Sequence, residues 1–537
     1  MSDAVRGGLN PIATVPPPEP GFTLSIARFV ILALMAGLLF LRQDFAHRNL
    51  GEIPRLWGGA PWPSLQFLYV TETALLLLLP IALRELWRLK KLHRGVTPIG
   101  TEPFQSGLGW PLYLALAFAG WGMLHALFSF VASQPRDTYL IARQSAMAGY
   151  AMFFVYAVLF FHRERRFVET AAALAFMTAI LTAAVDFIAQ YAGDPATPGP
   201  SRWIAFFNTK PYGQETLPIA ILASALIIVY SGTWFWRVVF LAVLAFVGWR
   251  QGIRFQSVVP ISIAGAVLAY LVLGFVSLAT SHEHTVKRAV MIIGLFAICG
   301  VGYAQVRQIM KKDTPQGHDV VTGTPVETDR NEVSAWSPTV YTDLLRRYES
   351  AQVPADPSQY VFSTRQAGLA ITDPEVYRLN TVYEAAPDNS VRNNIWRFLV
   401  WQQMGRDWWS GRPLIGAGVG KPWFYPALYH TQFHYGEDRL GLDPHNSFLN
   451  LLYRFGVVGF ALLLALIGSV LHTAWRALKR TGSGDVLLEG LLLYFFYTVF
   501  FAMFTVALEG SPYAMPFWLS LGLVYVRARQ VLHAVEG

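Results

Sequence analysis

Long apolar stretches constrain the fold of this chain more than any other sequence feature. About twelve of them are long enough to cross a hydrocarbon core of about 30 Å. They lie near residues 24–41, 64–83, 108–131, 145–161, 170–190, 217–230, 234–247, 258–280, 289–304, 447–472, 486–507 and 513–526. We therefore predict an all-α polytopic membrane protein with about twelve transmembrane helices.

The composition supports this class and excludes several others. The 537 residues are 54% hydrophobic and only 14% charged, and their mean hydropathy is +0.37, which does not fit a soluble globular domain. The single cysteine, Cys299, excludes a disulfide framework and a cysteine-based metal site. We expect no nucleic-acid partner, because no such motif is present and excess Lys and Arg in a membrane protein usually reflects topology.

The distribution of Lys and Arg predicts the orientation. With the N-terminus in the cytoplasm, the short cytoplasmic loops and both tails carry more Lys and Arg than the loops of the other side. This orientation places a long polar segment late in the chain on the outer face. The predicted organisation is a cytoplasmic tail (1–23), transmembrane helices 1–9 (24–304), a large periplasmic loop containing helices (305–446), transmembrane helices 10–12 (447–526) and a cytoplasmic tail (527–537).

The stretch GLDPHNSFLNLLYRFGVVGF, residues 441–460, joins the long loop to an apolar run. Asp443 suits a helix N-cap and Pro444 the first helical position, which places His445 in the first turn. The positive end of the helix dipole there disfavours imidazolium, so His445 should stay neutral and able to accept a proton. The alternative is that these residues only start a helix and His445 is incidental.

Cationic side chains on the predicted outer face are the second candidate set. Arg250 and Arg254 lie in a tight turn, WRQGIRFQ, and Arg202 and Lys210 lie in another outer loop. Guanidinium groups there can bind a diphosphate and stabilise a leaving group, whereas the alternative is lipid-headgroup contact. Together with a neutral histidine that takes the proton from an acceptor hydroxyl, such groups fit a reaction in which a lipid-linked diphosphate is the leaving group.

Two stretches of the long loop precede the histidine. The stretch 392–409 combines tryptophans with arginines, which suits either a helix lying on the bilayer or a helix packed under the loop. GRPLIGAGVGKPWF, residues 411–424, has four glycines but neither a P-loop nor a dinucleotide-binding context. We predict a structural turn there.

These stretches together resemble the core of the O-antigen ligase and polymerase superfamily. PLIGAGVGKPWF followed by DPHNSFLNLLYRFGVVGF is similar to that family's P-L-x-G-x-G turn, H-N-x-x-L helix start and G-x-x-G-F continuation. SVRNNIWRFLVW resembles its Arg–Trp helix, and FNTKPYGQETLPIAI, more loosely, an outer Asn-containing loop. The close resemblance covers residues 391–460.

The resemblance implies a glycosyltransferase of the bacterial inner membrane with a periplasmic active site and neither metal nor other cofactor. Its donor would be an undecaprenyl-diphosphate-linked glycan, and its acceptor lipid A–core or a growing polysaccharide. His445 matches the essential histidine, and Arg250 and Arg254 match the region of the outer-turn arginine. We further expect Arg202, Lys210, Arg392, Arg397 and Asn446 to bind substrate. The chain departs from the family in having WRQGIR for a Ser-Arg-Gly-like turn and a longer loop section at 305–390.

Ligase and polymerase use the same chemistry, and the histidine motif favours a ligase. A transporter of lipid-linked oligosaccharide is the alternative from another class. It would require buried charges and inverted repeats, but the sequence offers few intramembrane acids, such as Glu72 and Asp186, and no clear repeat. A non-catalytic assembly protein is a third alternative.

Overall fold

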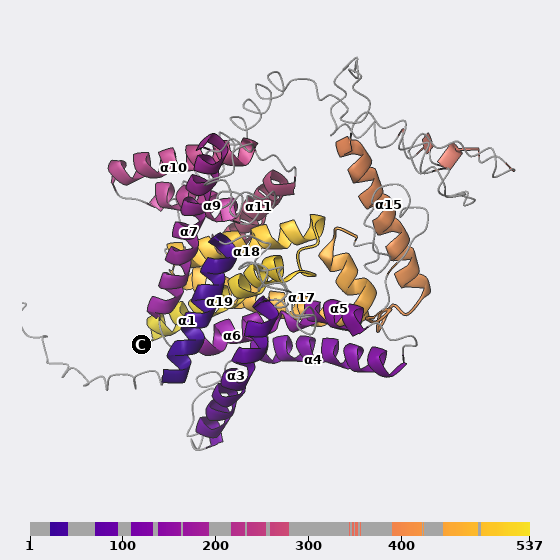
Figure 1. The fold of residues 1–537 in the computed structure, drawn as a ribbon. Coiled ribbons are helices and arrows are strands. Elements are labelled where there is room, and N and C mark those ends of the chain that lie inside the picture. The colour runs from indigo at the N-terminus through magenta and orange to yellow at the C-terminus, as the bar shows by residue number, and fades with distance from the viewer. Residues whose placement is uncertain are drawn as a thin grey trace, which may run out of the picture.

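The computed structural model describes a helical protein (Figure 1). It describes residues 22–40, 70–94, 109–132, 138–162, 165–192, 216–230, 233–253, 258–278, 389–420, 444–481 and 485–536, with isolated positions between 343 and 355 and at 378 and 423. No strand occurs within these ranges. The all-α prediction is therefore confirmed for the described part of the chain.

The helices follow the predicted apolar stretches closely. They are α1 (Phe22–Phe40), α3 (Val70–Arg94), α4 (Gly109–Ala132), α5 (Thr138–Gly149), α6 (Met152–Phe161), α7 (Arg165–Ala192), α9 (Thr216–Tyr230), α10 (Trp234–Ile253), α11 (Val258–Leu278), α15 (Asn389–Ser410), α17 (Ser447–Thr481), α18 (Val486–Phe504) and α19 (Ser511–Glu536). Five described helical stretches are long and apolar enough to cross a membrane, namely 109–132, 140–161, 166–184, 447–481 and 486–504. Four shorter apolar helical stretches accompany them, and the number of about twelve spans stays a prediction.

Four predicted stretches ended too early. Beyond their predicted ends at 83, 247, 472 and 526, α3 continues to Arg94, α10 to Ile253, α17 to Thr481 and α19 to Glu536. The added residues are mostly Arg, Lys, Leu, Gln and Ala, which are good helix formers. Charge ends an apolar stretch without ending a helix, because long cationic side chains reach the polar interface from a helical backbone. The predicted span near 289–304 lies outside the described residues.

The central helices are α18 and α19, which pack against each other and are flanked by α6, α11 and α17 (Figure 1). Small residues allow close approach at two contacts. A Cβ on Gly122 of α4 would lie 2.2 Å from Ala148 Cβ of α5, and one on Gly522 of α19 would lie 2.6 Å from Ala157 Cβ of α6. Such contacts are typical of helices packed within a membrane, where close van der Waals packing replaces the hydrophobic driving force.

The Trp- and Arg-containing helix α15 packs on α17 at the side of the bundle (Figure 1). Val400 and Met404 are fully buried, whereas Trp409 is 74% exposed. The helix predicted at 392–409 is therefore present, and one of its faces is covered by protein.

Candidate functional site

The backbone of α17 is broken at Gly456. This residue has φ 66° and ψ −172°, a combination that is essentially restricted to glycine. The break removes helical hydrogen bonds on both sides, and unpaired backbone groups are costly in a chain that crosses lipid. Their partners must therefore come from another segment.

The glycine-rich turn supplies those partners. Ala417 N donates to Tyr453 O (2.8 Å) and Gly418 N donates to Arg454 O (3.0 Å). In return, Val457 N donates to Pro413 O (2.9 Å) and Val458 N to Leu414 O (3.1 Å). Residues 413–418 thus pair with both sides of the break, and the sequence prediction of a structural turn is confirmed.

Glycine is required at both sides of this pairing. A Cβ on Gly416 would lie 2.3 Å from Arg454 O, and a Cβ on Gly456 would lie 2.3 Å from Leu414 O. Gly416, Gly418 and Gly420 all have positive φ, between 81° and 86°. The two glycine motifs recognised separately in the sequence are therefore one structural unit.

Neighbouring helices fix the turn in place. Trp408 Nε1 of α15 donates to Pro413 O (3.1 Å), and Gly420 N donates to Gln144 Oε1 of α5 (2.7 Å). Trp121 Nε1 of α4 donates to Phe455 O (3.0 Å), which satisfies a further carbonyl at the break. The glycine-rich stretch consequently joins α5 and α15 to the first half of α17, and α4 binds α17 directly.

His445 lies two residues before α17 and not in its first turn. The helix begins at Ser447, and Asn446 is its N-cap, because Asn446 Oδ1 accepts from Leu449 N (3.0 Å). The predicted N-cap, Asp443, lies outside the described residues. The prediction placed the helix start too early because Asp-Pro and Asn-Ser are both good helix starts. His445 has φ 49°, a left-handed conformation in which histidine is enriched among non-glycine residues.

The surroundings of His445 keep its ring neutral. Burial, and then the positive charge of Arg397, lower the pKa of His445 from 6.5 to about 4. This low pKa agrees with the expected neutral imidazole, but its main cause is desolvation and not the helix dipole. On α15, Trp401 Nε1 donates a hydrogen bond to Pro444 O, which fixes the backbone next to the histidine.

Arg397 is a partly buried cation next to this base. Burial lowers the pKa of Arg397, and no ion pair to it occurs among the residues that the structure describes. An anionic ligand would offset that desolvation cost. The pair can therefore accept a proton at His445 and hold negative charge at Arg397.

A buried polar network lies one turn below the histidine and was missed in the sequence. Ser447, Asn450 and Arg454 are nearly fully buried. Glu509, in the connection between α18 and α19, accepts from Asn450 Nδ2 (2.9 Å) and from Ser447 Oγ, and Arg454 Nε donates to Asn450 Oδ1 (2.9 Å). The spacing of residues 447, 450 and 454 is the sequence pattern that could have revealed this network, because it places all three side chains on one helix face.

A second polar cluster lies on α5, beside the glutamine that holds the turn. Arg143 Nη1 pairs with Glu72 Oε1 of α3 at 2.5 Å, and Tyr150 OH donates to the same oxygen at 2.6 Å. Glu72 was identified in the sequence as an intramembrane acid, but its two partners were not. Helix packing alone brings these three positions together.

Of the other predicted site residues, two lie on described helices and three lie outside the described residues. Arg392 lies on α15 with Arg397, and Arg250 lies in the last turn of α10, so the predicted tight turn around Arg250 was wrong. Arg202, Lys210 and Arg254 lie outside the described residues. The structure thus brings together His445, Asn446 and Arg397 of the predicted set.

Comparison with known proteins adds no assignment, since no family model matches the chain and no curated protein sequence is significantly similar to it. Within the described residues, no three His, Cys, Asp or Glu side chains converge as metal ligands would.

Proposed function

We propose that this protein is a membrane glycosyltransferase that moves a glycan from undecaprenyl diphosphate to an acceptor hydroxyl. The observation that carries the proposal is the neutral, partly buried His445 next to the partly buried cation Arg397 at the entrance to α17. The sequence resemblance of residues 391–460 to O-antigen ligases and polymerases supports it independently.

In the proposed reaction, the neutral ring of His445 takes the proton from the acceptor hydroxyl as its oxygen bonds to the anomeric carbon of the glycan. The bond from that carbon to the diphosphate oxygen breaks, and the diphosphate leaves with the electron pair. Arg397 would stabilise this developing charge. Arg250, Arg254, Arg202, Lys210 and Arg392 are the other cations proposed to bind the donor. Water exclusion by the tryptophans of α15 would strengthen these interactions.

The proposal also specifies the membrane and the orientation of the protein in it. The enzyme would lie in a bacterial inner membrane, with about twelve spans, both termini in the cytoplasm and the 305–446 loop in the periplasm. This arrangement is supported by the excess of Lys and Arg in the loops and tails assigned to the cytoplasm, and by the five apolar helical stretches. The donor and acceptor would meet at the outer membrane surface, where the glycan and the lipid carrier are both accessible.

Ligation to lipid A–core is proposed ahead of polymerisation on the basis of the histidine motif. A deletion strain complemented with wild type or His445→Ala distinguishes the two. Long polymer that stays on the lipid carrier in the variant indicates a ligase, whereas single repeat units indicate a polymerase. Full complementation by His445→Ala would overturn the proposal.

A transporter is the second candidate, because a broken helix and buried charges favour it. Arg28, Glu489 and Arg454 are buried in helices of the bundle. Against it, the backbone groups at the break are already paired with residues 413–418, so the half-helix ends offer few groups to a substrate. Uptake of lipid-linked oligosaccharide into liposomes that survives His445→Ala would favour the transporter.

A further inference from the structure

A group of apolar side chains next to the glycine-rich turn is exposed on the surface of the protein. It comprises Trp409 at the end of α15, Leu414 and Ile415 of the turn, and Val457 and Val458 of α17; we call it the turn surface. Leu414 is 66% exposed and Ile415 is 44% exposed. Exposed apolar side chains that lie together mark a surface that a protein partner or lipid covers.

Hydrogen bonds hold the members of the turn surface together. Val458 N donates to Leu414 O (3.1 Å), so the turn lies level with the start of the second half of α17. Trp408 Nε1 donates to Pro413 O (3.1 Å), and the ring centroids of Trp408 and Trp409 lie 5.8 Å apart. The turn surface is therefore continuous across three segments of the chain.

The second half of α17 gives the distance from the turn to the opposite membrane face. The helix belongs to a stretch that is long and apolar enough to cross a membrane. It contains no Lys, Arg, Asp or Glu from Val457 to Trp475, and Arg476, Lys479 and Arg480 follow. From Val457 to Arg476 it rises about 28 Å, nearly the whole of a hydrocarbon core of about 30 Å. With Arg476 at one edge of the core, Val457 and the turn lie at the other edge.

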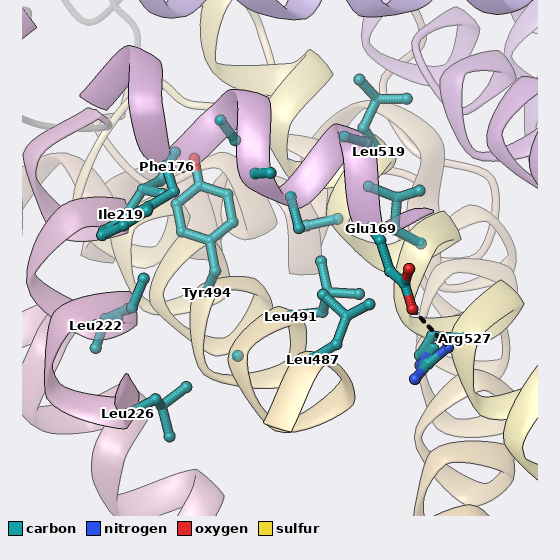
Figure 2. Close-up of a pocket in the computed structure, with 18 of the residues that line it drawn as sticks. Glu169, Phe176, Ile219, Leu222, Leu226, Leu487, Leu491, Tyr494, Leu519 and Arg527 are labelled. Atoms are coloured by element: carbon teal, nitrogen blue, oxygen red, sulfur yellow. Dashed lines mark ion pairs between the residues drawn. The ribbon is translucent and has the colours of Figure 1, made fainter. Parts of the chain in front are cut away.

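α18 gives the same thickness independently. It starts at the membrane face where α17 ends, because only a short connection separates the two helices, and its 19 residues rise about 28 Å. Charge marks this start, where Arg527 Nη2 binds Asp485 Oδ2 (2.7 Å) and Glu169 Oε1 lies 4.0 Å from Arg527 Nη1, at one end of a mostly apolar cavity (Figure 2). At the other end of α18, the ring centroid of Phe504 lies 6.3 Å from that of Trp401 on α15. The middle of α15 and the turn therefore lie at the same edge of the membrane.

We propose that the turn surface lies within the edge of the hydrocarbon core and contacts the acyl chains of phospholipids. Acyl chains are the cover because the surface continues an exposed apolar face of α17. Leu464, two turns from Val457 on the same helix face, is 50% exposed near the middle of the apolar stretch. Arg406 and Arg412 flank the surface and are exposed, and they fit the phosphate groups of the headgroups, since Trp and Arg together are typical of the membrane–water interface. The turn thus anchors the segment 305–446 in the membrane, and this inference does not depend on the proposed glycosyltransferase activity.

Depth measurements on the full-length protein in liposomes test this proposal. Leu414→Cys is made in a Cys299→Ser background and labelled with a nitroxide. Leu464→Cys is the reference inside the hydrocarbon, and Glu349→Cys, at an exposed acidic position of the long polar segment, is the reference in water. Collisions of each label with oxygen, which dissolves in hydrocarbon, and with a water-soluble nickel chelate are measured by electron paramagnetic resonance. We expect the oxygen-to-nickel collision ratio at residue 414 to be several-fold higher than at residue 349.

A second label at the neighbouring residue measures the depth itself. Ile415→Cys and Leu464→Cys, each labelled with bimane, are quenched by phospholipids that carry a nitroxide either near the carbonyl or near the methyl end of the acyl chain. The nitroxide near the carbonyl should quench the label at residue 415 more strongly, and the nitroxide near the methyl end should quench the label at residue 464 more strongly. Both replaced side chains are exposed, and an unchanged elution volume in size-exclusion chromatography confirms that each variant is folded.

Three outcomes would overturn the proposal. Equal collision ratios at residues 414 and 349 would place the turn in water. A label at residue 414 that neither oxygen nor the nickel chelate reaches would assign the turn surface to a contact with protein. Stronger quenching at residue 415 by the nitroxide near the methyl end would contradict the depth derived from α17.

Discussion

Replacing Gly456 by alanine should separate the glycine turn from α17. The added Cβ would lie 2.3 Å from Leu414 O and 2.5 Å from Gly416 N, both backbone atoms. A side-chain rotation cannot relieve this overlap, so the turn must move away. The backbone conformation at Gly456 adds strain of about 1–3 kcal/mol for any residue with a Cβ.

The expected loss of stability follows from the bonds that hold the turn. Four backbone hydrogen bonds, of 2.8–3.1 Å, join residues 413–418 to 453–458. Leaving even one of these buried donors unpaired costs about 1–3 kcal/mol. Together with the strain, we expect a decrease of at least about 3 kcal/mol in the free energy of unfolding.

Gly468→Ala is the matched control. Gly468 lies further along the same helix, and a Cβ there would have no atom within 4 Å. Because alanine is the better helix former, this change should stabilise the protein by up to about 1 kcal/mol. Both variants are unfolded by sodium dodecyl sulfate in mixed micelles and followed by tryptophan fluorescence. Equal free energies of unfolding for the two variants would refute the account of the helix break.

Three further predictions concern His445 and its supports. The rate of glycan transfer should persist to acidic pH and fall as the pH drops through the pKa of His445 near 4, because only the neutral ring accepts a proton. Arg397→Gln removes a positive charge that lowers this pKa, so the fall in rate should move to higher pH. A pH–rate profile that does not shift in the variant would contradict the assignment. Trp401→Phe removes the hydrogen bond to Pro444 O and should reduce kcat while leaving the melting temperature nearly unchanged. A lower melting temperature with an unchanged kcat would limit Trp401 to a structural role. Ser447→Ala removes the acceptor of the Ala507 and Leu508 amides, which lie 2.8 and 2.9 Å from Ser447 Oγ, and should lower the free energy of unfolding by about 1–3 kcal/mol. The hydroxyl of Ser469 binds a carbonyl of its own helix, so Ser469→Ala should leave the free energy of unfolding nearly unchanged. Equal losses in the two variants would argue against the network.

The sequence predicted the helices well because apolar length is a local property. Described helices overlap eleven of the predicted apolar stretches. Helix ends were less predictable, because cationic residues that end an apolar stretch still favour a helical backbone, as at Arg94 and Arg250. The start of α17 was misplaced by a few residues, since two adjacent capping signals compete in Asp-Pro-His-Asn.

The site was only partly predictable from the sequence. His445, Asn446 and Arg397 were recognised from residue type and local pattern. The pairing of Gly416 with Gly456, the acceptor role of Glu509 and the Arg143–Glu72 pair depend on contacts between residues far apart in the chain. Neither periodicity nor spacing within one segment contains that information, so only the packed structure reveals these partners.

The central claim is that His445 accepts the proton from the acceptor hydroxyl. It is tested most directly with purified protein in liposomes that contain undecaprenyl-diphosphate-linked glycan and a soluble or lipid-borne hydroxyl acceptor. We expect wild type to form the glycosylated acceptor and release undecaprenyl diphosphate, and His445→Gln to lose at least about a hundredfold in rate with unchanged unfolding behaviour. A folded His445→Gln variant that transfers glycan at the wild-type rate would contradict the account.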